Sequence, residues 1–132
     1  MARARVARLA LLDTHVVCWL YAGRVDLLSS AAVRLIESAQ IAVSPIVRLE
    51  LQYLFEIKRI VRRADQILNV LAADIGLAVR QEPFDGVVKA ASSITWTRDP
   101  FDRLQVGHAQ LVRAAFITRD ELIRTRFTAA VW

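Results

Sequence analysis

The sequence predicts an α/β fold of three layers, with a central parallel sheet of about five strands flanked by helices. Short apolar runs alternate along the chain with longer amphipathic segments, which is the pattern of successive strand–helix–strand units. Hydrophobic residues make up 55% of the chain against only four glycines and three prolines, which favours dense packing with short connections and excludes a disordered protein. A chain of 132 residues fits one domain with one core, so a single domain over residues 1–132 is expected.

The predicted strands are short runs of apolar residues that are long enough to be buried on both faces of a sheet. The first, "ARLALLDT", ends in polar residues, and the later ones are bounded in the same way. The expected strands are residues 7–14, 41–44, 77–82, 114–118 and 128–132. In parallel sheets covered by helices, ligands bind beyond the carboxyl ends of the strands, so the residues that follow these runs are the first candidates for a site.

The predicted helices are segments whose apolar residues recur with a period near 3.6. Gly23 closes the first, and Ser44 is placed as the N-cap of the central one, with Pro45 at its first helical position. The segment that begins at Phe84 is a weaker helix because Gly86 lies in its first turn. The expected helices are residues 15–23, 29–39, 44–60, 64–74, 84–94, 100–114 and 119–126.

The charge of the chain suits a polyanionic ligand. The formal net charge is +5, the sequence pI is near 10.3, and almost all the cationic side chains are arginine. Arginine binds phosphate through a bidentate fork, which favours nucleic acid as a partner. An arginine-rich genome and an ordinary solvated surface explain the same charge equally well.

The N-terminal segment and the single cysteine bear on the cellular compartment. The opening "MARARVARLALL" imitates a secretory signal, but Asp13 and His15 cut its apolar run short, and no run approaches the ~20 residues that span a bilayer. Cys18 has no partner for an intramolecular disulfide and lies in an apolar run, as a core thiol would. A soluble cytoplasmic protein is expected.

Two of the acids directly follow predicted strands. Asp13 closes the first strand, and Asp120 follows "AAFIT" after one residue, so both stand where the fold places functional side chains. Each is equally suited to cap the helix that comes next. Thr14 can share the capping of that first helix or hydrogen-bond a metal-bound water.

Glu50 is the acid with the least ordinary surroundings. On a helical period it shares a face with Ile46, Val47, Leu51 and Leu54, an apolar stripe that should face the sheet. A carboxylate there is costly to ionise unless a cation or strong donors offset the loss of water. A salt bridge to an arginine is the alternative explanation. Glu56, which stands among basic residues, has the character of a surface acid.

The stretch "TRDPFDRLQVGHAQ" holds two more acids, Asp99 and Asp102. Asp99 before Pro100 is a strong N-cap signature, and Asp102 then falls at the third helical position, where an acid can complete a capping box. Capping alone would explain both. However, Asp102 lies one turn before Val106 and Gly107 and can therefore point inward.

Taken together, Asp13, Glu50, Asp102 and Asp120 are harder to explain as independent caps. Four carboxylates brought close in a partly dehydrated cleft repel one another unless a cation lies between them. Ligands that are all oxygens select hard ions, so Mg²⁺ or Mn²⁺ is the expected occupant.

The pattern resembles the PIN domain, and within it the VapC-type ribonuclease toxins of type II toxin–antitoxin pairs. The third of the matching segments is the most specific, since Asp-Pro-Phe-Asp-Arg opening a helix is frequent in one VapC-like branch. The segments that carry the resemblance, in chain order, are "LLDTHVVCWL", "VSPIVRLELQYLFEIKRI", "WTRDPFDRLQVGHAQL", "FITRDELI" and the terminal "VW".

The resemblance implies a catalytic and metal-binding role for four acids, carried over by position. Asp13 matches the first metal-binding acid, Glu50 the glutamate of the central helix, Asp102 the third acid and Asp120 the frequent fourth. The sequence departs from the pattern at Gly107 and His108, where alanine and glutamine are more usual; His108 is expected to be packed or exposed and not catalytic.

Other residues take supporting roles by the same resemblance. Thr14 and Thr118 match small hydroxyl residues that border the site, and Asp99 is placed as a cap or as a residue behind the metal ligands. Arg98 and Arg103 are the nearest cations in sequence and would bind the RNA backbone, or else pair with the acids. A basic cluster at the end of the central helix, formed by Arg59, Arg62 and Arg63, is either an RNA contact or an ordinary solvated face.

The function expected from the resemblance is a Mg²⁺- or Mn²⁺-dependent endoribonuclease that hydrolyses RNA with metal-activated water. It further implies a cognate VapB-type antitoxin that masks the acids, and a homodimer. Two alternatives remain: a catalytically silent PIN-like module that binds RNA or protein, and a receiver domain of a signalling protein. A receiver normally has paired acids after its first strand and a lysine at a late strand end, whereas Asp13 stands alone and both lysines, Lys58 and Lys89, lie in predicted helices.

Overall fold

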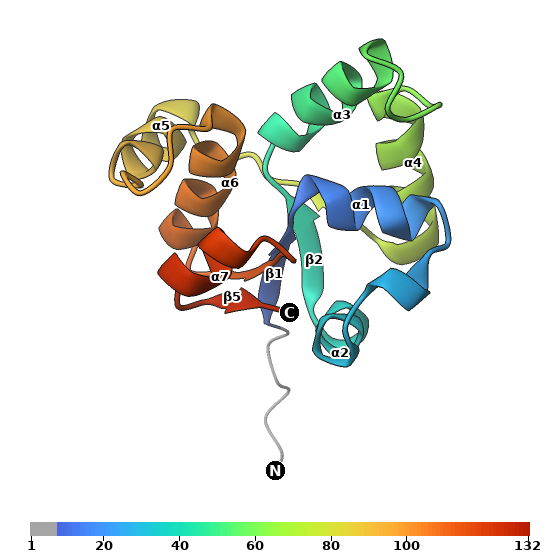
Figure 1. Cartoon of the computed structure of the whole chain (residues 1–132), viewed down its shortest axis with the longest axis horizontal. Helices are drawn as coiled ribbons and strands as arrows, with labels where there is room; N and C mark the ends of the chain where they lie inside the picture. Colours follow the sequence, from blue (N-terminus) through green and yellow to red (C-terminus); the bar gives the residue numbers. More distant parts are fainter. Residues whose placement is uncertain (1–7) are drawn as a thin grey trace.

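Five short strands form one parallel sheet in the computed structural model, which describes residues 8–132 (Figure 1). The order across the sheet is β3-β2-β1-β4-β5. The bounds are Leu9–Leu12 for β1, Gln40–Val43 for β2, Ala78–Val79 for β3, Ala115–Ile117 for β4 and Ala130–Val131 for β5. The predicted fold class and strand number are confirmed. The signal-like start of the chain, residues 1–7, lies outside the described residues.

Seven α-helices and one short 3-10 helix join these strands within residues 8–132. The α-helices are α1 Thr14–Tyr21, α2 Ser30–Ser38, α3 Ile46–Glu56, α4 Ala64–Ile75, α5 Phe84–Ser92, α6 Pro100–Leu111 and α7 Glu121–Arg126. The 3-10 turn, Val25–Leu27, was not anticipated from sequence. None of these helices is long and apolar enough to cross a membrane.

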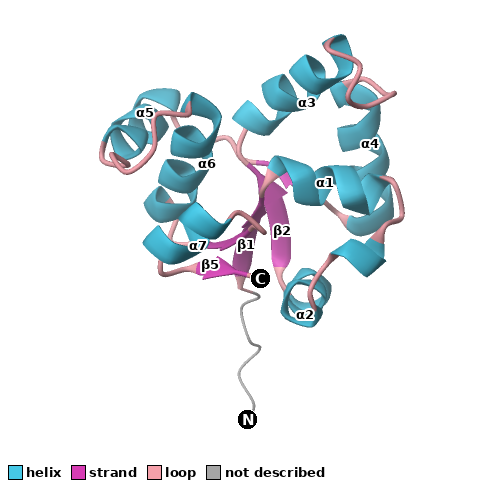
Figure 2. Ribbon diagram, in the orientation of Figure 1, coloured by secondary structure: helices cyan, strands magenta, loops and turns pink. Residues whose placement is uncertain are grey.

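The helices are divided between the two faces of the sheet (Figure 2). Side chains alternate along each strand, so Ala10 and Leu12 of β1 face one core and Leu11 faces the other. Helices α1, α2 and α4 cover the first face, while α6 and α7 cover the second, with α5 packed on the outer side of α6. The chain therefore has the three predicted layers.

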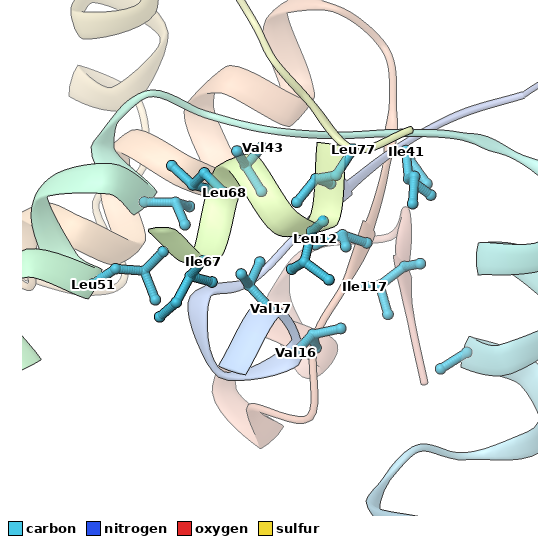
Figure 3. Close-up of a cluster of buried hydrophobic side chains, with 14 of the residues drawn as sticks. Leu12, Val16, Val17, Ile41, Val43, Leu51, Ile67, Leu68, Leu77 and Ile117 are labelled. Atoms are coloured by element: carbon cyan, nitrogen blue, oxygen red, sulfur yellow. The ribbon is translucent and has the colours of Figure 1, made fainter. Parts of the chain in front are cut away.

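The larger core lies under α1 and α4 (Figure 3). Val16 and Val17 of α1 and Ile67 and Leu68 of α4 meet strand residues such as Leu12 there, all with less than a tenth of their surface exposed. Burying an aliphatic side chain of this size contributes roughly 1.5–3 kcal/mol, so this cluster is the main support for the carboxyl ends of β1 and β2.

Two helices end earlier than the sequence pattern predicted. Helix α3 ends at Glu56 instead of near residue 60, because Lys58 takes a left-handed conformation with φ of 63°. Helix α6 ends at Leu111 instead of residue 114, because Arg113 does the same with φ of 55°. A positive φ ends an α-helix, and glycine is the usual sequence signal for it. Lysine and arginine give no such signal, so the sequence did not predict these two ends. The strand predicted over residues 77–82 is reduced to two residues.

The predicted N-cap role of Ser44 is wrong. Pro45 occupies the cap position of α3, and no side chain caps that helix. The Ser44 hydroxyl instead lies 2.8 Å from Nδ1 of His108, on α6. The hydroxyl that the local sequence assigned to the start of α3 therefore pairs with a distant residue, His108.

Helices α5 and α6 are in unusually close contact at Gly107. A Cβ atom at this position would lie 2.6 Å from the backbone nitrogen of Ala91 and 2.7 Å from its Cα. Neither atom can move without shifting the whole of α5. Gly107 is therefore required by the approach of two backbones.

We predict that Gly107→Ala lowers the free energy of unfolding by about 2 kcal/mol, because the overpacking exceeds what alanine gains in helix propensity. The matched control is Gly86→Ala in α5, where the new Cβ would meet only Leu111 Cδ2 at 3.8 Å. That variant should be neutral or stabilised by up to about 1 kcal/mol. Urea unfolding measures both, and equal behaviour of the two variants would contradict the close contact.

Candidate active site

The site lies at the carboxyl ends of β1 and β4, which are neighbours in the sheet (Figure 1). The chain leaves β1 on one face of the sheet, through α1, and leaves β4 on the other, through α7. Asp13 follows β1, and Thr118 and Asp120 follow β4. The Asp13 N–H donates to the carbonyl oxygen of Ile117 at 3.0 Å, which continues the pairing of the two strands by one residue. Open α/β sheets bind ligands at such a point.

Asp13 is buried, with 5% of its surface exposed, and both of its oxygens accept hydrogen bonds. Oδ1 accepts the Thr14 N–H at 2.7 Å, and Oδ2 accepts the Thr118 hydroxyl at 2.6 Å. Nδ1 of His15 lies 3.6 Å from Oδ2. Burial raises the pKa of Asp13, while His15 and the two hydrogen bonds oppose the rise. The residue caps α1, as one of the two sequence interpretations held, and still faces the other acids.

Glu50 reaches the site from α3. Its Oε1 accepts hydrogen bonds from the Thr14 hydroxyl and from Nε2 of Gln105 at 3.2 Å. Burial raises the pKa of Glu50 more than the two hydrogen bonds lower it, and the charges of Asp13 and Asp99 add to the rise. Within residues 8–132 no arginine or lysine forms a salt bridge with it.

The Asp102 carboxylate also has a strongly raised pKa. Burial raises its pKa to about 7, and Asp99, Asp13, Asp120 and Glu50 all contribute to the rise through their negative charges. All of these acids are therefore within electrostatic reach of Asp102. The half-buried carboxylate accepts no hydrogen bond from any described residue.

The capping functions of the remaining acids are now clear. Asp99 caps α6 through Oδ1, which accepts the N–H of Phe101 at 2.8 Å and of Asp102 at 3.3 Å. The Asp99 N–H goes to Thr97 Oγ1 at 3.2 Å, so the predicted capping box does not use Asp102. Asp120 caps α7 through Oδ1, which accepts the N–H of Ile123 at 2.9 Å.

Arg98 lies in the connection between α5 and α6, and Arg103 lies on α6 and reaches the end of α5. Arg98 donates to the carbonyl of Thr95 at 2.9 Å, and Arg103 donates to the carbonyls of Ala91 and Ser92 at 3.3 and 3.4 Å. Both line a cavity of about 320 Å³ between the two helices. Neither is paired with an acid of the site in the structure as described.

The basic cluster and the cysteine lie on the α1, α3 and α4 side. Arg59, Arg62 and Arg63 are exposed in and beside the α3–α4 connection, and the Arg63 guanidinium stands 5.5 Å from the centre of the Phe55 ring. Cys18 is partly buried against the larger core, and burial raises the pKa of its thiol to about 11. A thiol in that state is not a nucleophile at neutral pH.

The donor set fits a hard divalent cation in chemistry, although the ligands are not gathered as a finished cage. No three Asp, Glu, His or Cys side chains among the described residues are close enough together to hold one ion. Burial is the largest cause of the raised pKa of Asp102 and of Glu50, the negative charges of neighbouring acids add to it, and a bound cation would offset both. The oxygens of Asp13, Glu50, Asp102 and Asp120 are the available ligands.

Two polar features of the site were missed in the sequence. Gln105, only 1% exposed, donates to both Glu50 and Thr14. Its position one turn after Asp102 was the feature of the sequence that could have identified it.

His108 is completely buried, as one expectation held, but it links Ser44 to Glu82, whose carboxylate lies 2.7 Å from Nε2. Hydrogen bonds from Arg80, and to a lesser degree His108, lower the pKa of Glu82 to about 2.

Comparison with solved structures places this fold among chains of toxin–antitoxin complexes. A chain of a toxin–antitoxin complex from Klebsiella pneumoniae matches with a TM-score of 0.67 at 20% identity, covering 93% of this chain and 96% of that one. VapBC2 from Rickettsia felis, bound to a DNA fragment from its promoter, matches with a TM-score of 0.58 at 16% identity, over 93% and 96% of the two chains. VapBC-1 from nontypeable Haemophilus influenzae gives 0.57 at 17% identity, over 94% and 96%.

The comparison by sequence is carried by a family model. No curated protein matches the chain. The model of the PIN domain matches residues 10–126, which include every acid of the site, and this finding excludes the receiver domain. The chain belongs to the PIN-domain family.

Proposed function

We propose that this protein is a Mg²⁺- or Mn²⁺-dependent endoribonuclease that acts in the cytoplasm as the toxin of a VapBC-type pair. The observation that carries the proposal is Asp102, whose pKa is raised to about 7 by burial and by four neighbouring acids, and to which no cationic side chain of residues 8–132 is paired. Carboxylates whose pKa is strongly raised by burial and by neighbouring acids are typical of functional sites. Membership in the PIN family, whose VapC members are generally metal-dependent nucleases, supports the same conclusion.

The four acids share one task in the proposed site, which is to bind a divalent ion. A bound divalent ion would lower the pKa of the attacking water and neutralise negative charge at the scissile phosphate. Asp13, Glu50, Asp102 and Asp120 provide its oxygen ligands. The hydroxyl of Thr118 fixes Asp13, at 2.6 Å.

The remaining polar residues orient the site. Thr14 holds the Glu50 carboxylate, and Thr118 also accepts the Asp120 N–H at 3.0 Å, which ties two of the acids to one hydroxyl. Asp99 fixes the start of α6 and so the direction in which Asp102 leaves it. These hydrogen bonds support a positioned set of ligands in place of four independent caps.

We assign RNA as the substrate and Arg98 and Arg103 as contacts to its backbone. Both guanidinium groups lie near the start of α6, the helix that carries Asp102, and neither forms a salt bridge with an acid among residues 8–132. Each keeps N–H groups beyond those bonded to backbone carbonyls, because a guanidinium has five. The net charge of +5 supports a polyanionic substrate.

The proposed partners are a VapB-type antitoxin and a second copy of the chain. The solved structures with this fold include VapBC complexes, which supports an antitoxin as partner. An antitoxin that covers the acids would switch the nuclease off.

A catalytically silent PIN module is the second candidate. It is favoured by the spacing of the acids, since no three potential ligands in residues 8–132 are gathered around one point. Such a module would bind RNA or protein without cleaving it, so cleavage that depends on metal separates the two functions.

We predict that the purified protein cleaves structured RNA in the presence of Mn²⁺ or Mg²⁺ and stops when a chelator is added. Asp13→Asn and Asp102→Asn should each reduce the cleavage rate by about a hundredfold or more, because each removes a charged ligand of the proposed ion. Gel analysis of end-labelled RNA measures the rate.

The control for charge alone is Asp74→Asn, at an exposed acid on α4. This variant should cleave at the wild-type rate. Wild-type protein that leaves every RNA intact with either ion, or site variants as active as the control, would defeat the nuclease assignment.

We predict that Asp102→Asn makes the metal-free protein more stable at pH 8. The folded-state pKa near 7 lies above the value of about 3.9 in an unfolded chain, so ionisation of Asp102 penalises folding. The penalty begins near pH 4, grows up to pH 7 and is complete above that, and its sources are burial first and then the charges of Asp99, Asp13, Asp120 and Glu50.

The measurement is the melting temperature of both proteins in chelator from pH 4.5 to 8. The variant should exceed wild type by several degrees at pH 8 and by less at pH 4.5. Added Mn²⁺ should stabilise the wild type more than the variant. A pH-independent difference would show that Asp102 is not held under charge repulsion.

The toxin assignment predicts that induced production of the wild-type protein arrests growth of a bacterial host, because uncontrolled RNA cleavage stops translation. Production of Asp13→Asn to the same level should leave growth unchanged. Optical density and an immunoblot check both arms. Normal growth of cells that accumulate folded, RNA-cleaving wild-type protein would contradict the toxin role and leave the nuclease intact.

A further inference from the structure

The buried side chain of Gln105 connects α6 to α1 and α3 beside the acids of the site. It lies on α6, one turn beyond Asp102, and is 1% exposed. Its Nε2 donates to Oε1 of Glu50, on α3, at 3.2 Å and approaches Oγ1 of Thr14, on α1, at 3.4 Å. The Thr14 hydroxyl donates to the same Glu50 oxygen. Two donors from different helices therefore converge on one oxygen of Glu50.

The other end of the Gln105 amide has no partner. Its Oε1 is the single buried side-chain nitrogen or oxygen without a hydrogen bond in the part of the chain that the structure describes. A leucine or methionine would fill a similar volume without leaving an acceptor unsatisfied. Packing alone does not explain a glutamine at this position.

The direction of the amide depends on the state of Glu50. An ionised carboxylate has no proton to donate, so Oε1 of Gln105 cannot face it, and only the observed orientation, with Nε2 toward Glu50, gives an attractive contact. The amide thus favours the charged form of a carboxylate whose burial opposes charge. Oε2 of Glu50 accepts no hydrogen bond from residues 8–132 and is left for another ligand.

We infer that Gln105 is a positioning residue that holds Glu50 by one oxygen, through a hydrogen bond from Nε2, so that the other oxygen is presented to a divalent cation. This inference rests on the proposed metal site and adds a residue to it. Residues behind a metal ligand typically change affinity by about 10- to 100-fold when they are removed.

The experiment measures Mn²⁺ binding directly, by electron paramagnetic resonance of free Mn²⁺, with RNA cleavage as a second readout. Gln105→Leu and Gln105→Met, which keep the buried volume and remove the amide, should weaken Mn²⁺ binding about tenfold. Gln110→Leu, at an exposed glutamine of the same helix, is the matched control and should bind as wild type does. Circular dichroism and the melting temperature in chelator show that each variant is folded.

A double-mutant cycle tests whether Gln105 acts through Glu50. In the Glu50→Gln background, adding Gln105→Leu should change Mn²⁺ affinity less than twofold, because the carboxylate that the amide positions is gone. A tenfold loss in both backgrounds would show that Gln105 acts by packing and would overturn the inference. So would Gln105→Leu and Gln105→Met that bind Mn²⁺ as tightly as wild type.

The outcomes separate this inference from the proposed function. Wild-type protein that binds no Mn²⁺ and cleaves no RNA defeats the metal-dependent nuclease itself, and the inference with it. Wild-type protein that binds and cleaves, with Glu50→Gln or both Gln105 variants unimpaired, defeats the inference alone.

Discussion

The cost of ionising carboxylates that are buried beside one another is the constraint on which the site depends. Asp13 is almost wholly buried, Glu50 and Asp102 are half-buried, and burial is the largest cause of the raised pKa of all three. A fold selected for stability alone would replace at least one of these acids by a neutral residue, since each carboxylate makes the ionisation of the others harder. Their retention beside one another, with no lysine or arginine paired to them in the described structure, is the physical argument for a cation as the missing partner.

Capping and chemistry are compatible at this site because each carboxylate has two oxygens. Oδ1 of Asp120 caps α7, and Oε1 of Glu50 is held by Thr14 and Gln105, while the second oxygen of each accepts no hydrogen bond from residues 8–132. Asp13 uses both oxygens, one for Thr14 at the start of α1 and one for Thr118 after β4. The cap therefore fixes the carboxylate, and a fixed carboxylate is a better ligand than a mobile one because less rotamer freedom is lost on binding.

Local patterns in the sequence were sufficient for the sheet, the helices and three of the caps, because apolar periodicity and cap residues act within one element. Asp99 and Asp120 cap the helices that the sequence assigned to them. The partner of Ser44 could not be found in this way, because His108 is 64 residues away and reaches it only after α6 has packed. Gln105 was missed for the same reason: on sequence alone it is one of several polar residues in its helix, and its hydrogen-bond partners lie on α1 and α3.

The contact between α3 and α6 explains why Asp102 lies near Glu50. Three side-chain pairs lie along this contact: Ser44, just before α3, with His108, Glu50 with Gln105, and Tyr53 with Phe101. Residue numbers rise on one side as they fall on the other, so the two helices are antiparallel. A purely apolar seam would tolerate a slide of one helix along the other, whereas a shift of one turn here would leave buried hydrogen-bonding groups without partners. The polar pairs thus set the register of two antiparallel helices. Asp102 lies between Phe101 and Gln105 along α6, so the same register keeps its carboxylate within electrostatic reach of Glu50.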